Sequence, residues 1–191
     1  MAHKDPLELL VGIAKILRTL SIPYLVTGGM AVLIWGRPRF TADIDIVIEL
    51  QRSDVDKLEI ALKALGNKGF IDKDTIIEAL STQGEFNFID GSTGVKIDFW
   101  ILGNSAFDQR RIKRRVKKII LGKTIWFSSP EDLILIKAAW YKESQSSRQI
   151  EDIESIFAIS ADNLDRKYLK RWATSLGVSP ILAKFLQDKS D

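Results

Sequence analysis

Three aspartates lie where carboxylates could hold a divalent metal ion. Asp43 and Asp45 begin the apolar segment 43–50, and Asp98 lies within a second apolar segment, 95–102. If 43–50 is a strand, Asp43 and Asp45 project from the same face about 6.5–7 Å apart. A carboxylate in an apolar strand is costly to bury unless it is paired or metal-bound, and such ligands suit Mg²⁺ or Mn²⁺. We therefore expect Asp43, Asp45 and Asp98 to form a metal site if the two strands are adjacent.

The aspartate pair alone does not require a metal, because exposed strand faces are commonly polar. Further support comes from Thr27, Gly28 and Gly29, which end one apolar segment and precede a helical one. Glycine lets a ligand approach the backbone closely, and the N–H groups at a helix N-terminus bind anions. A plain turn would also use these residues. A phosphate-binding turn followed by metal-binding carboxylates is the minimal equipment for in-line nucleotidyl transfer.

The sequence argues against several other catalytic chemistries. It contains no cysteine, and its single histidine is His3, near the N-terminus. A Ser-His-Asp triad, a Cys-His pair and an HExxH zinc site therefore all lack a plausible imidazole. Catalysis would depend on carboxylates, lysine, hydroxyls or metals with oxygen ligands. The lack of cysteine is compatible with a reducing compartment, and we expect a cytoplasmic location.

A dense basic cluster lies within residues 110–118. The net charge of the chain is +3, and without this cluster it would be −4, so the basic character is local. Such a run is typical of a solvated surface, but it would also attract the phosphates of RNA or DNA. The candidate acceptor contacts are Arg110, Arg111, Lys113, Arg114 and Arg115, which Lys117 and Lys118 follow.

The remaining pattern predicts an α+β fold, with a mixed β-sheet flanked by helices. Apolar spacing predicts a helix over 7–20, a short strand over 22–26 and the aspartate strand over 43–50. Turn-forming residues at 90–94 and at 122–123 predict two hairpins. Further helices are expected over 30–35, 54–65, 72–80, 105–114, 131–142, 148–158 and 165–176, with a last one after residue 179.

We expect a boundary near residue 128. Residues 1–128 would form the catalytic core, and the helical region 129–191 would complete the nucleotide or acceptor site. No apolar run approaches the roughly 20 residues that span a bilayer, so no membrane partner is expected. The first 17 residues include a proline and two acidic residues, which favours an amphipathic helix over a signal peptide.

These motifs resemble the DNA polymerase β-type nucleotidyltransferase superfamily. Its signature is Gly-Gly, thirteen further residues, Asp-x-Asp and a distant Asp; here these are Gly28-Gly29, Asp43-Ile44-Asp45 and Asp98. Within the superfamily, the sequence around Asp43 and the helical tail look most like the prokaryotic AbiE-type toxin nucleotidyltransferases, and lincosamide-modifying enzymes are also similar. The chain departs from the pattern at Met30, where a serine or another small residue is usual. The hydroxyl contact to the terminal phosphate would therefore either be absent or come from Thr27.

The resemblance implies roles for individual residues. Asp43 and Asp45 would bind both metal ions, and Asp98 would bind the catalytic one and help to deprotonate the acceptor hydroxyl. Gly28 and Gly29 would cradle the nucleotide phosphates. Arg39 and Thr41 would steady the loop or touch phosphate, although Arg39 is equally suited to a solvated loop.

Lys137 is a further candidate for nucleotide binding. Its helical neighbours are apolar or aromatic, which argues against a simply solvated position, although a snorkelling lysine would fit the same pattern. A lysine at this place in the resembling group contacts the nucleotide phosphates. The following segment 148–152 resembles a basic–acidic motif of that group, which makes Asp152 a weaker candidate beside Glu151 and Glu154.

The leading hypothesis is a metal-dependent nucleotidyltransferase that uses an NTP and modifies RNA such as tRNA. Such an enzyme could be the toxin of a toxin–antitoxin pair, with an antitoxin protein as partner. The first alternative is the same chemistry on a small molecule, such as an antibiotic hydroxyl. The second is a non-catalytic nucleic-acid-binding module, which the presence of all three carboxylates disfavours.

Overall fold

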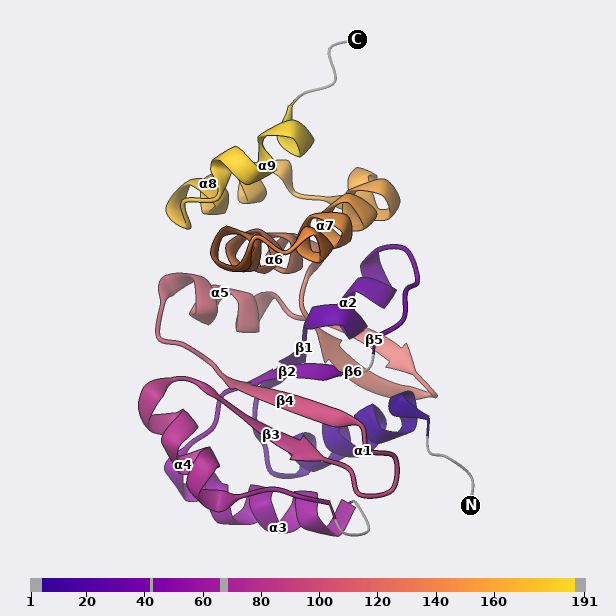
Figure 1. Cartoon of the computed structure of the whole chain (residues 1–191), viewed down its shortest axis with the longest axis vertical. Coiled ribbons are helices and arrows are strands. Elements are labelled where there is room, and N and C mark those ends of the chain that lie inside the picture. Colours follow the sequence, from indigo (N-terminus) through magenta and orange to yellow (C-terminus); the bar gives the residue numbers. More distant parts are fainter. Residues whose placement is uncertain (1–4, 42, 66–68, 188–191) are drawn as a thin grey trace. The chain divides into compact units, whose positions relative to one another are not determined.

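The chain divides by its internal contacts into two compact units. Unit 1 comprises Met1–Met30 and Phe40–Ser128, and unit 2 comprises Ala31–Arg39 and Ser129–Asp191. The computed structural model describes residues 5–41, 43–65 and 69–187 (Figure 1). His3 therefore lies outside the described residues.

Unit 1 is built on one six-stranded mixed sheet with the strand order β3-β4-β2-β1-β6-β5. Strand β2 runs parallel to β4, and β1 runs parallel to β6; the other neighbours are antiparallel. This arrangement confirms the predicted α+β fold with a mixed sheet. The strands are β1 (Tyr24–Val26), β2 (Ile44–Ile48), β3 (Glu85–Ile89), β4 (Lys96–Ile101), β5 (Val116–Ile120) and β6 (Lys123–Phe127).

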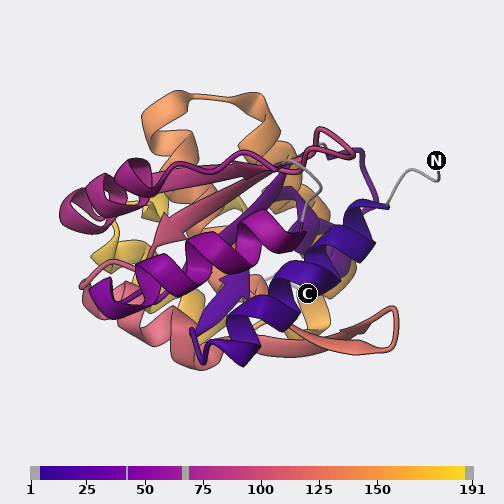
Figure 2. The same ribbon diagram turned by 90° about the horizontal axis from the view of Figure 1, so that it is seen from below.

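One face of this sheet carries the larger apolar core. Ile44, Ile46 and Ile48 alternate along β2, and each is at most 1% exposed. Phe99, the register neighbour of Ile46 on β4, stacks on Phe86 of β3 with ring centroids 5.0 Å apart. The helices α1 and α3 lie side by side on the sheet (Figure 2), and α4 packs on β3 and β4. These helices are α1 (Pro6–Thr19), α3 (Val55–Leu65), which follows the 3₁₀ turn η1 (Arg52–Asp54), and α4 (Lys73–Thr82).

The opposite face of the sheet carries a smaller apolar cluster. Leu25 and Val47 are cross-strand neighbours there, and they cluster with Leu102 and with Ile112 of α5 (Ala106–Arg114). Trp100 packs against this cluster while remaining partly exposed. Because side chains alternate along a strand, Asp45 lies on this second face beside Val47, and Asp98 lies there beside Trp100.

Both predicted hairpins are present. Strands β3 and β4 pair around the turn 90–95, in which the buried Asp90 carboxylate accepts hydrogen bonds from the backbone and hydroxyl groups of Ser92 and Thr93. The β5–β6 turn lies one residue earlier than predicted, at Leu121-Gly122. Both residues have positive φ (46° and 72°), which is the backbone of a type I′ turn.

Helix α2 (Gly28–Trp35) begins two residues earlier than predicted, at the glycine pair itself. The chain passes from unit 1 to unit 2 within this helix, after Met30. In unit 2 the end of the helix is held by α7 (Ser147–Ser160), because Ser160 Oγ donates to the Trp35 carbonyl at 2.6 Å. A Cβ on Gly36 would lie 2.5 Å from Ser155 Oγ, so the absence of a side chain permits this close packing.

Unit 2 is otherwise helical, and α6 (Pro130–Ser144) forms its centre. The buried Ser129 caps α6, since its Oγ accepts from the Asp132 N–H at 3.1 Å. The buried Asp132 carboxylate accepts from Ser129 Oγ at 2.9 Å and from the Tyr168 hydroxyl at 2.6 Å. The other elements are η2 (Ala161–Asn163), α8 (Arg166–Ser175) and α9 (Ser179–Leu186). Across the described ranges, no helix has the length and apolar character needed to cross a membrane.

The cap of α6 gives a first prediction. Replacing Ser129 by alanine removes the acceptor of the Asp132 N–H and one donor to the Asp132 carboxylate. We expect the free energy of unfolding to fall by about 1–2 kcal/mol in urea titrations. Ser144→Ala, at the exposed end of the same helix, is the matched control and should change it by less than about 0.5 kcal/mol. Equal effects of the two substitutions would contradict the capping role.

Candidate active site

Two of the predicted carboxylates lie side by side in the sheet. Strand β2 pairs in parallel with β4, and the register sets Asp45 directly opposite Asp98. Both side chains are only partly exposed, with 13% exposure for Asp98. Neighbouring strands are about 4.8 Å apart, so two like charges lie close together in a partly buried position. Such an arrangement favours a cation between or beside the carboxylates.

The backbone at Gly28 fits closely around Asp45. The Thr27 N–H donates to the Asp45 carbonyl at 2.9 Å, which fixes the glycine turn against β2. Gly28 has φ +59°, and a Cβ placed on it would lie 1.8 Å from Asp45 Oδ2. No side chain fits in this space, so the motif requires glycine here on two independent grounds. Gly29 follows in the first turn of α2 and is buried.

Thr27 itself is 1% exposed, and its hydroxyl has no hydrogen-bond partner among the described residues. A buried unpaired hydroxyl is unfavourable, and a bound phosphate oxygen or water would satisfy it. That Thr27 supplies the hydroxyl that Met30 lacks stays a prediction.

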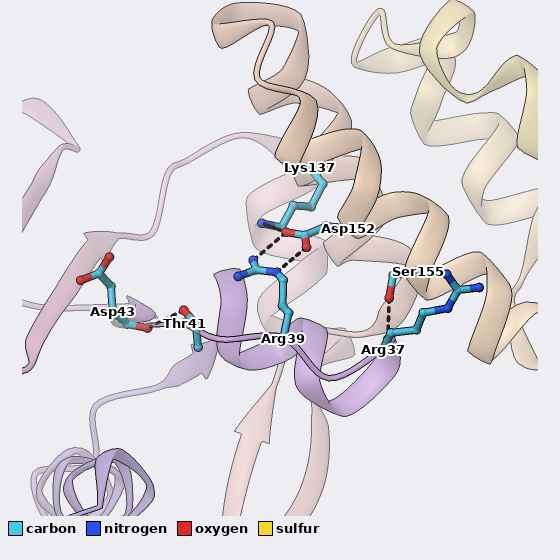
Figure 3. Close-up of polar contacts among 7 residues, drawn as sticks. All are labelled: Arg37, Arg39, Thr41, Asp43, Lys137, Asp152 and Ser155. Carbon is cyan, nitrogen blue, oxygen red and sulfur yellow. Dashed lines mark hydrogen bonds and ion pairs between the residues drawn. The ribbon is translucent and has the colours of Figure 1, made fainter.

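Asp43 occupies a different environment from the other two aspartates. It precedes β2 and is exposed. The half-buried Thr41 donates from its hydroxyl to the Asp43 carbonyl at 3.3 Å (Figure 3). Thr41 therefore holds the backbone of the loop leading into the aspartate strand, one of the two roles expected for it.

Two further charged residues, Lys96 and Glu85, adjoin this face. Lys96 Nζ forms an ion pair with Asp98 Oδ2 at 3.0 Å, and the hydrogen bond to this carboxylate raises the pKa of Lys96. Burial raises the pKa of Glu85 on β3, and the negative charges of Asp98 and Asp45 raise it further. Because side chains alternate along a strand, the sequence alone predicts that Lys96 lies on the same face as Asp98. Finding Glu85 needed the register of a hairpin with a six-residue connection, which sequence does not determine.

These residues can be tested for their fit to a divalent metal. Within residues 5–41, 43–65 and 69–187, no three acidic, imidazole or thiolate side chains converge closely enough to form a ready metal cluster. Asp45 and Asp98 nevertheless offer two hard oxygen ligands in register, and Mg²⁺ is commonly held by one or two carboxylates together with substrate phosphates. The donor set therefore fits a metal that arrives with a nucleotide, and the metal roles of Asp43, Asp45 and Asp98 stay predictions.

In unit 2, Asp152 is the centre of a buried ionic cluster. Arg39 Nε and a terminal guanidinium nitrogen donate to its two carboxylate oxygens at 2.6 and 2.8 Å (Figure 3). Lys137 Nζ lies 2.8 Å from Asp152 Oδ2 and 5.2 Å from the centroid of the Trp140 ring. Although burial opposes ionisation, the hydrogen bonds from Arg39 and Lys137 lower the pKa of Asp152 overall.

The cluster gives Arg39, Asp152 and Lys137 a shared structural role as partners in largely buried ion pairs. Arg39 is a partner of Asp152, 113 residues away, and not simply a solvated loop charge. Asp152 is 1% exposed, unlike the exposed Glu151 and Glu154 beside it. Lys137 is 3% exposed and ion-paired, so contact with a nucleotide phosphate remains a prediction for it.

The basic cluster is divided between α5 and β5. Arg110 and Lys113 are exposed, whereas Arg111 is 7% exposed and pairs with Asp108 at 3.2 Å. Arg114 is half-buried at the end of α5. Arg115 follows the helix and lies over the ring of Trp126, 4.6 Å from its centroid. The five candidates therefore do not form one continuous exposed face.

Comparison with solved structures defines the class of fold. The antibiotic-resistance factor ANT(2'')-Ia shares 16% identity with a TM-score of 0.60, and the match covers 95% of this chain and 97% of that protein. An antigenic nucleotidyltransferase-like protein from Paracoccidioides brasiliensis shares 20% identity with a TM-score of 0.56, covering 96% and 93%. The lincosamide antibiotic adenylyltransferase LnuA shares 15% identity with a TM-score of 0.53, covering 81% and 99%. The fold is that of the polymerase β-type nucleotidyltransferases.

The family itself is shown by sequence. Residues 15–178 match the model of the nucleotidyl transferase AbiEii toxins of type IV toxin–antitoxin systems, so the chain belongs to this family and is a nucleotidyltransferase. This confirms the family resemblance and the enzyme class inferred from the motifs. No curated protein sequence matches the chain.

The close fit around Gly28 gives a second prediction. In Gly28→Ala the new methyl group displaces the Asp45 carboxylate and narrows the turn. We expect the affinity for an NTP with Mg²⁺, measured by calorimetry, to fall about tenfold or more, which is about 1.4 kcal/mol. The matched control is Gly94→Ala, which also has positive φ (+72°) but whose Cβ would meet nothing within 4 Å. Equal affinities of the two variants would show that the contact with Asp45 is unimportant.

The buried cluster gives a third prediction. Asp152→Asn leaves Arg39 and Lys137 without their shared countercharge, so we expect a loss of about 3–5 kcal/mol at pH 7 in urea unfolding. Because the pKa of Asp152 is lowered on folding, its contribution is present above the unfolded-state pKa of about 3.9 and lost as the pH falls through the folded value. The free energy of unfolding of the variant should therefore decrease less steeply as the pH is lowered than that of the unaltered protein.

The control for this experiment lies on the same helix. Glu154 forms an exposed ion pair with Lys184 at 2.7 Å, and Glu154→Gln should cost less than about 1 kcal/mol. An Asp152→Asn protein that is as stable as the Glu154→Gln protein at pH 7 would refute the structural importance of the cluster.

Proposed function

We propose that this nucleotidyltransferase moves a nucleoside monophosphate from an NTP to an RNA acceptor such as tRNA, as the toxin of a toxin–antitoxin pair. The observation that carries the reaction is the register of Asp45 with Asp98 beside the turn at Gly28. The basic residues of α5 and β5 support a polyanionic acceptor, because lysine and arginine bind phosphates and release counterions.

Each step of the reaction has a residue suited to it. The backbone at Gly28 admits the triphosphate, and Asp45 with Asp43 would hold Mg²⁺, or Mn²⁺, against it. The bound metal would neutralise the phosphates and stabilise the departing pyrophosphate. Asp98 would take the proton from the acceptor hydroxyl. The hydroxyl oxygen would then bond to the α-phosphorus, while the bond from that phosphorus to the pyrophosphate breaks. Lys96 Nζ lies 3.0 Å from Asp98 Oδ2, beside the carboxylate that this step uses.

A small cationic acceptor is the second candidate, and one feature of unit 1 favours it. A cavity of about 500 Å³ between α4 and β3 is lined by Asp72, Glu78 and Glu85. Glu85 is also within electrostatic range of Asp98. ANT(2'')-Ia has been solved with adenylyl-2''-tobramycin. An acidic cavity next to the carboxylate face would suit such a polyamine, whereas the basic residues favour RNA.

The fourth prediction tests both acceptors with one enzyme. Purified protein is incubated with Mg²⁺ and each α-labelled NTP, and with either total tRNA or tobramycin. We expect label on tRNA, and we expect Asp45→Asn to lower the rate by about two orders of magnitude or more, the scale for losing one preorganised electrostatic contact. Glu49→Gln, at the far end of the same strand segment, is the control and should transfer normally.

The outcomes separate the hypotheses. Label on tobramycin alone would replace the RNA acceptor with the small-molecule one. If neither acceptor is labelled by the folded protein with any NTP, transfer to these acceptors is refuted. If Asp45→Asn matches the unaltered enzyme, the metal role assigned to Asp45 is wrong.

An antitoxin protein is the partner we propose from family membership. If the chain is the toxin, its expression alone should arrest growth, and the Asp45→Asn protein should not. Growth arrest by the Asp45→Asn protein would favour a non-catalytic binding module instead.

A further inference from the structure

A second pocket lies in unit 1 at the opposite end of β1 from the glycine turn. It has a volume of about 240 Å³ and lies where the end of α1, the start of β1 and the strand β6 meet. Tyr24 begins β1, and Thr27 follows its end, so about 10 Å of strand separates this pocket from the turn. The lining is formed by Arg18, Tyr24, Arg115, Thr124 and Trp126, with the segment 21–23.

The pocket is positively charged. Two guanidinium groups line it, from Arg18 in the last turn of α1 and from Arg115 after α5, and none of the described lining residues is acidic. Arg115 donates from one terminal nitrogen to the Ile112 carbonyl, and its Nε is buried without a hydrogen-bond partner among the described residues. Since a buried unpaired donor on a charged group is costly, an anion at this place would be strongly favoured.

The aromatic residues of the pocket add specificity. Arg115 Cζ lies 4.6 Å and Lys117 Nζ lies 5.0 Å from the centroid of the Trp126 ring. Both cations therefore contact the same indole through cation–π interactions. Burial raises the pKa of Tyr24, although a hydrogen bond with the Trp126 backbone and the charges of Arg18 and Arg115 oppose the shift. The phenol therefore stays protonated at neutral pH and can donate a hydrogen bond to an oxygen anion.

The surrounding hairpin extends this surface. Strand β5 is an edge strand of the sheet, and Lys117 and Ile119 are exposed on it, with Ile119 67% exposed. Cross-strand pairing sets Lys117 opposite Trp126 and Ile119 opposite Thr124. This hairpin therefore carries cations, an indole and an exposed apolar side chain along one ribbon. A nucleic-acid strand presents phosphates, which bind cations, and base faces, which stack on aromatic and apolar side chains.

We propose that this pocket binds a backbone phosphate of the RNA acceptor through Arg18, Arg115 and Tyr24, with Trp126 and Lys117 contacting the adjoining nucleotide. The proposal rests on the proposed function for its choice of RNA. It gives the acceptor a binding site in unit 1 separate from the catalytic carboxylates. It also explains why Arg115 differs from the other basic residues of its cluster: it alone lines this pocket.

Binding of tRNA to the full chain, without NTP or Mg²⁺, tests the pocket independently of catalysis. Filter binding over a series of KCl concentrations would compare the unaltered protein with Arg18→Gln, Arg115→Gln and the double variant. We expect each single change to weaken binding about tenfold and to reduce the salt slope by about 0.7–0.9, the value for one phosphate contact. Lys57→Gln on α3 removes the same charge from an exposed site far along the sequence and should alter neither quantity by as much.

Two further arms identify the ligand and guard against misfolding. Inorganic phosphate and AMP should compete only at concentrations far above that of tRNA, because they supply one contact; equal competition would indicate a free-phosphate site and overturn the RNA assignment. Competition by poly-glutamate but not by single-stranded RNA would indicate an acidic protein instead, and would also overturn it. Arg18 is exposed, so Arg18→Gln should keep the unfolding midpoint of the unaltered protein even if Arg115→Gln does not.

Failure of this proposal and failure of the proposed function would look different. If tRNA is labelled but the Arg18 and Arg115 variants bind it with unchanged affinity and salt slope, the pocket proposal is overturned and the transfer reaction stands. If no tRNA is labelled but these variants lose binding, the pocket is supported and the assigned acceptor chemistry fails.

Discussion

The parallel pairing of β2 with β4 is the constraint on which the site depends. It sets Asp45 beside Asp98, and the cost of two like charges in a partly buried position must be offset. Lys96, which lies on β4 with Asp98, offsets part of this cost through its ion pair with Asp98. Because Gly28 has no side chain, the Asp45 carboxylate has room beside it. The apolar residues that alternate with these aspartates, Ile44 and Ile46 among them, hold the register, because a slip by one residue would bury the carboxylates in the core.

In unit 2 the buried charge at the centre of the ionic cluster is that of Asp152. Asp152 is almost fully buried, and its charge is tolerated because two cations reach it from separate segments. The same carboxylate therefore fixes the loop that ends at Arg39 and the centre of α6 at Lys137. Removing either cation leaves the other partner bound, whereas removing Asp152 leaves two buried or half-buried cations near each other.

The sequence predicted most helices and strands, because the spacing of apolar residues and the residues that form turns depend only on neighbouring positions. The strand alternation around Asp98, the Ser129 cap and both hairpins follow from neighbouring residues alone. What could not be predicted depends on long-range pairing. The bidentate contact of Arg39 with Asp152, the proximity of Glu85 to Asp98, and the pocket that joins Arg18 to Arg115 all need a tertiary register that one sequence does not contain. The grouping of residues 31–39 with the C-terminal helices is of the same kind.

The contact between Arg39 and Asp152 also has a consequence for the order of assembly during synthesis. The two residues are 113 positions apart, and a ribosome adding 5–20 residues per second needs about 6–23 s to travel from one to the other. During that interval the segment 31–39 has emerged without α7, the helix that holds it. The contact with Asp152 therefore forms only after several seconds of further synthesis, and α7 docks onto a segment that was translated long before it.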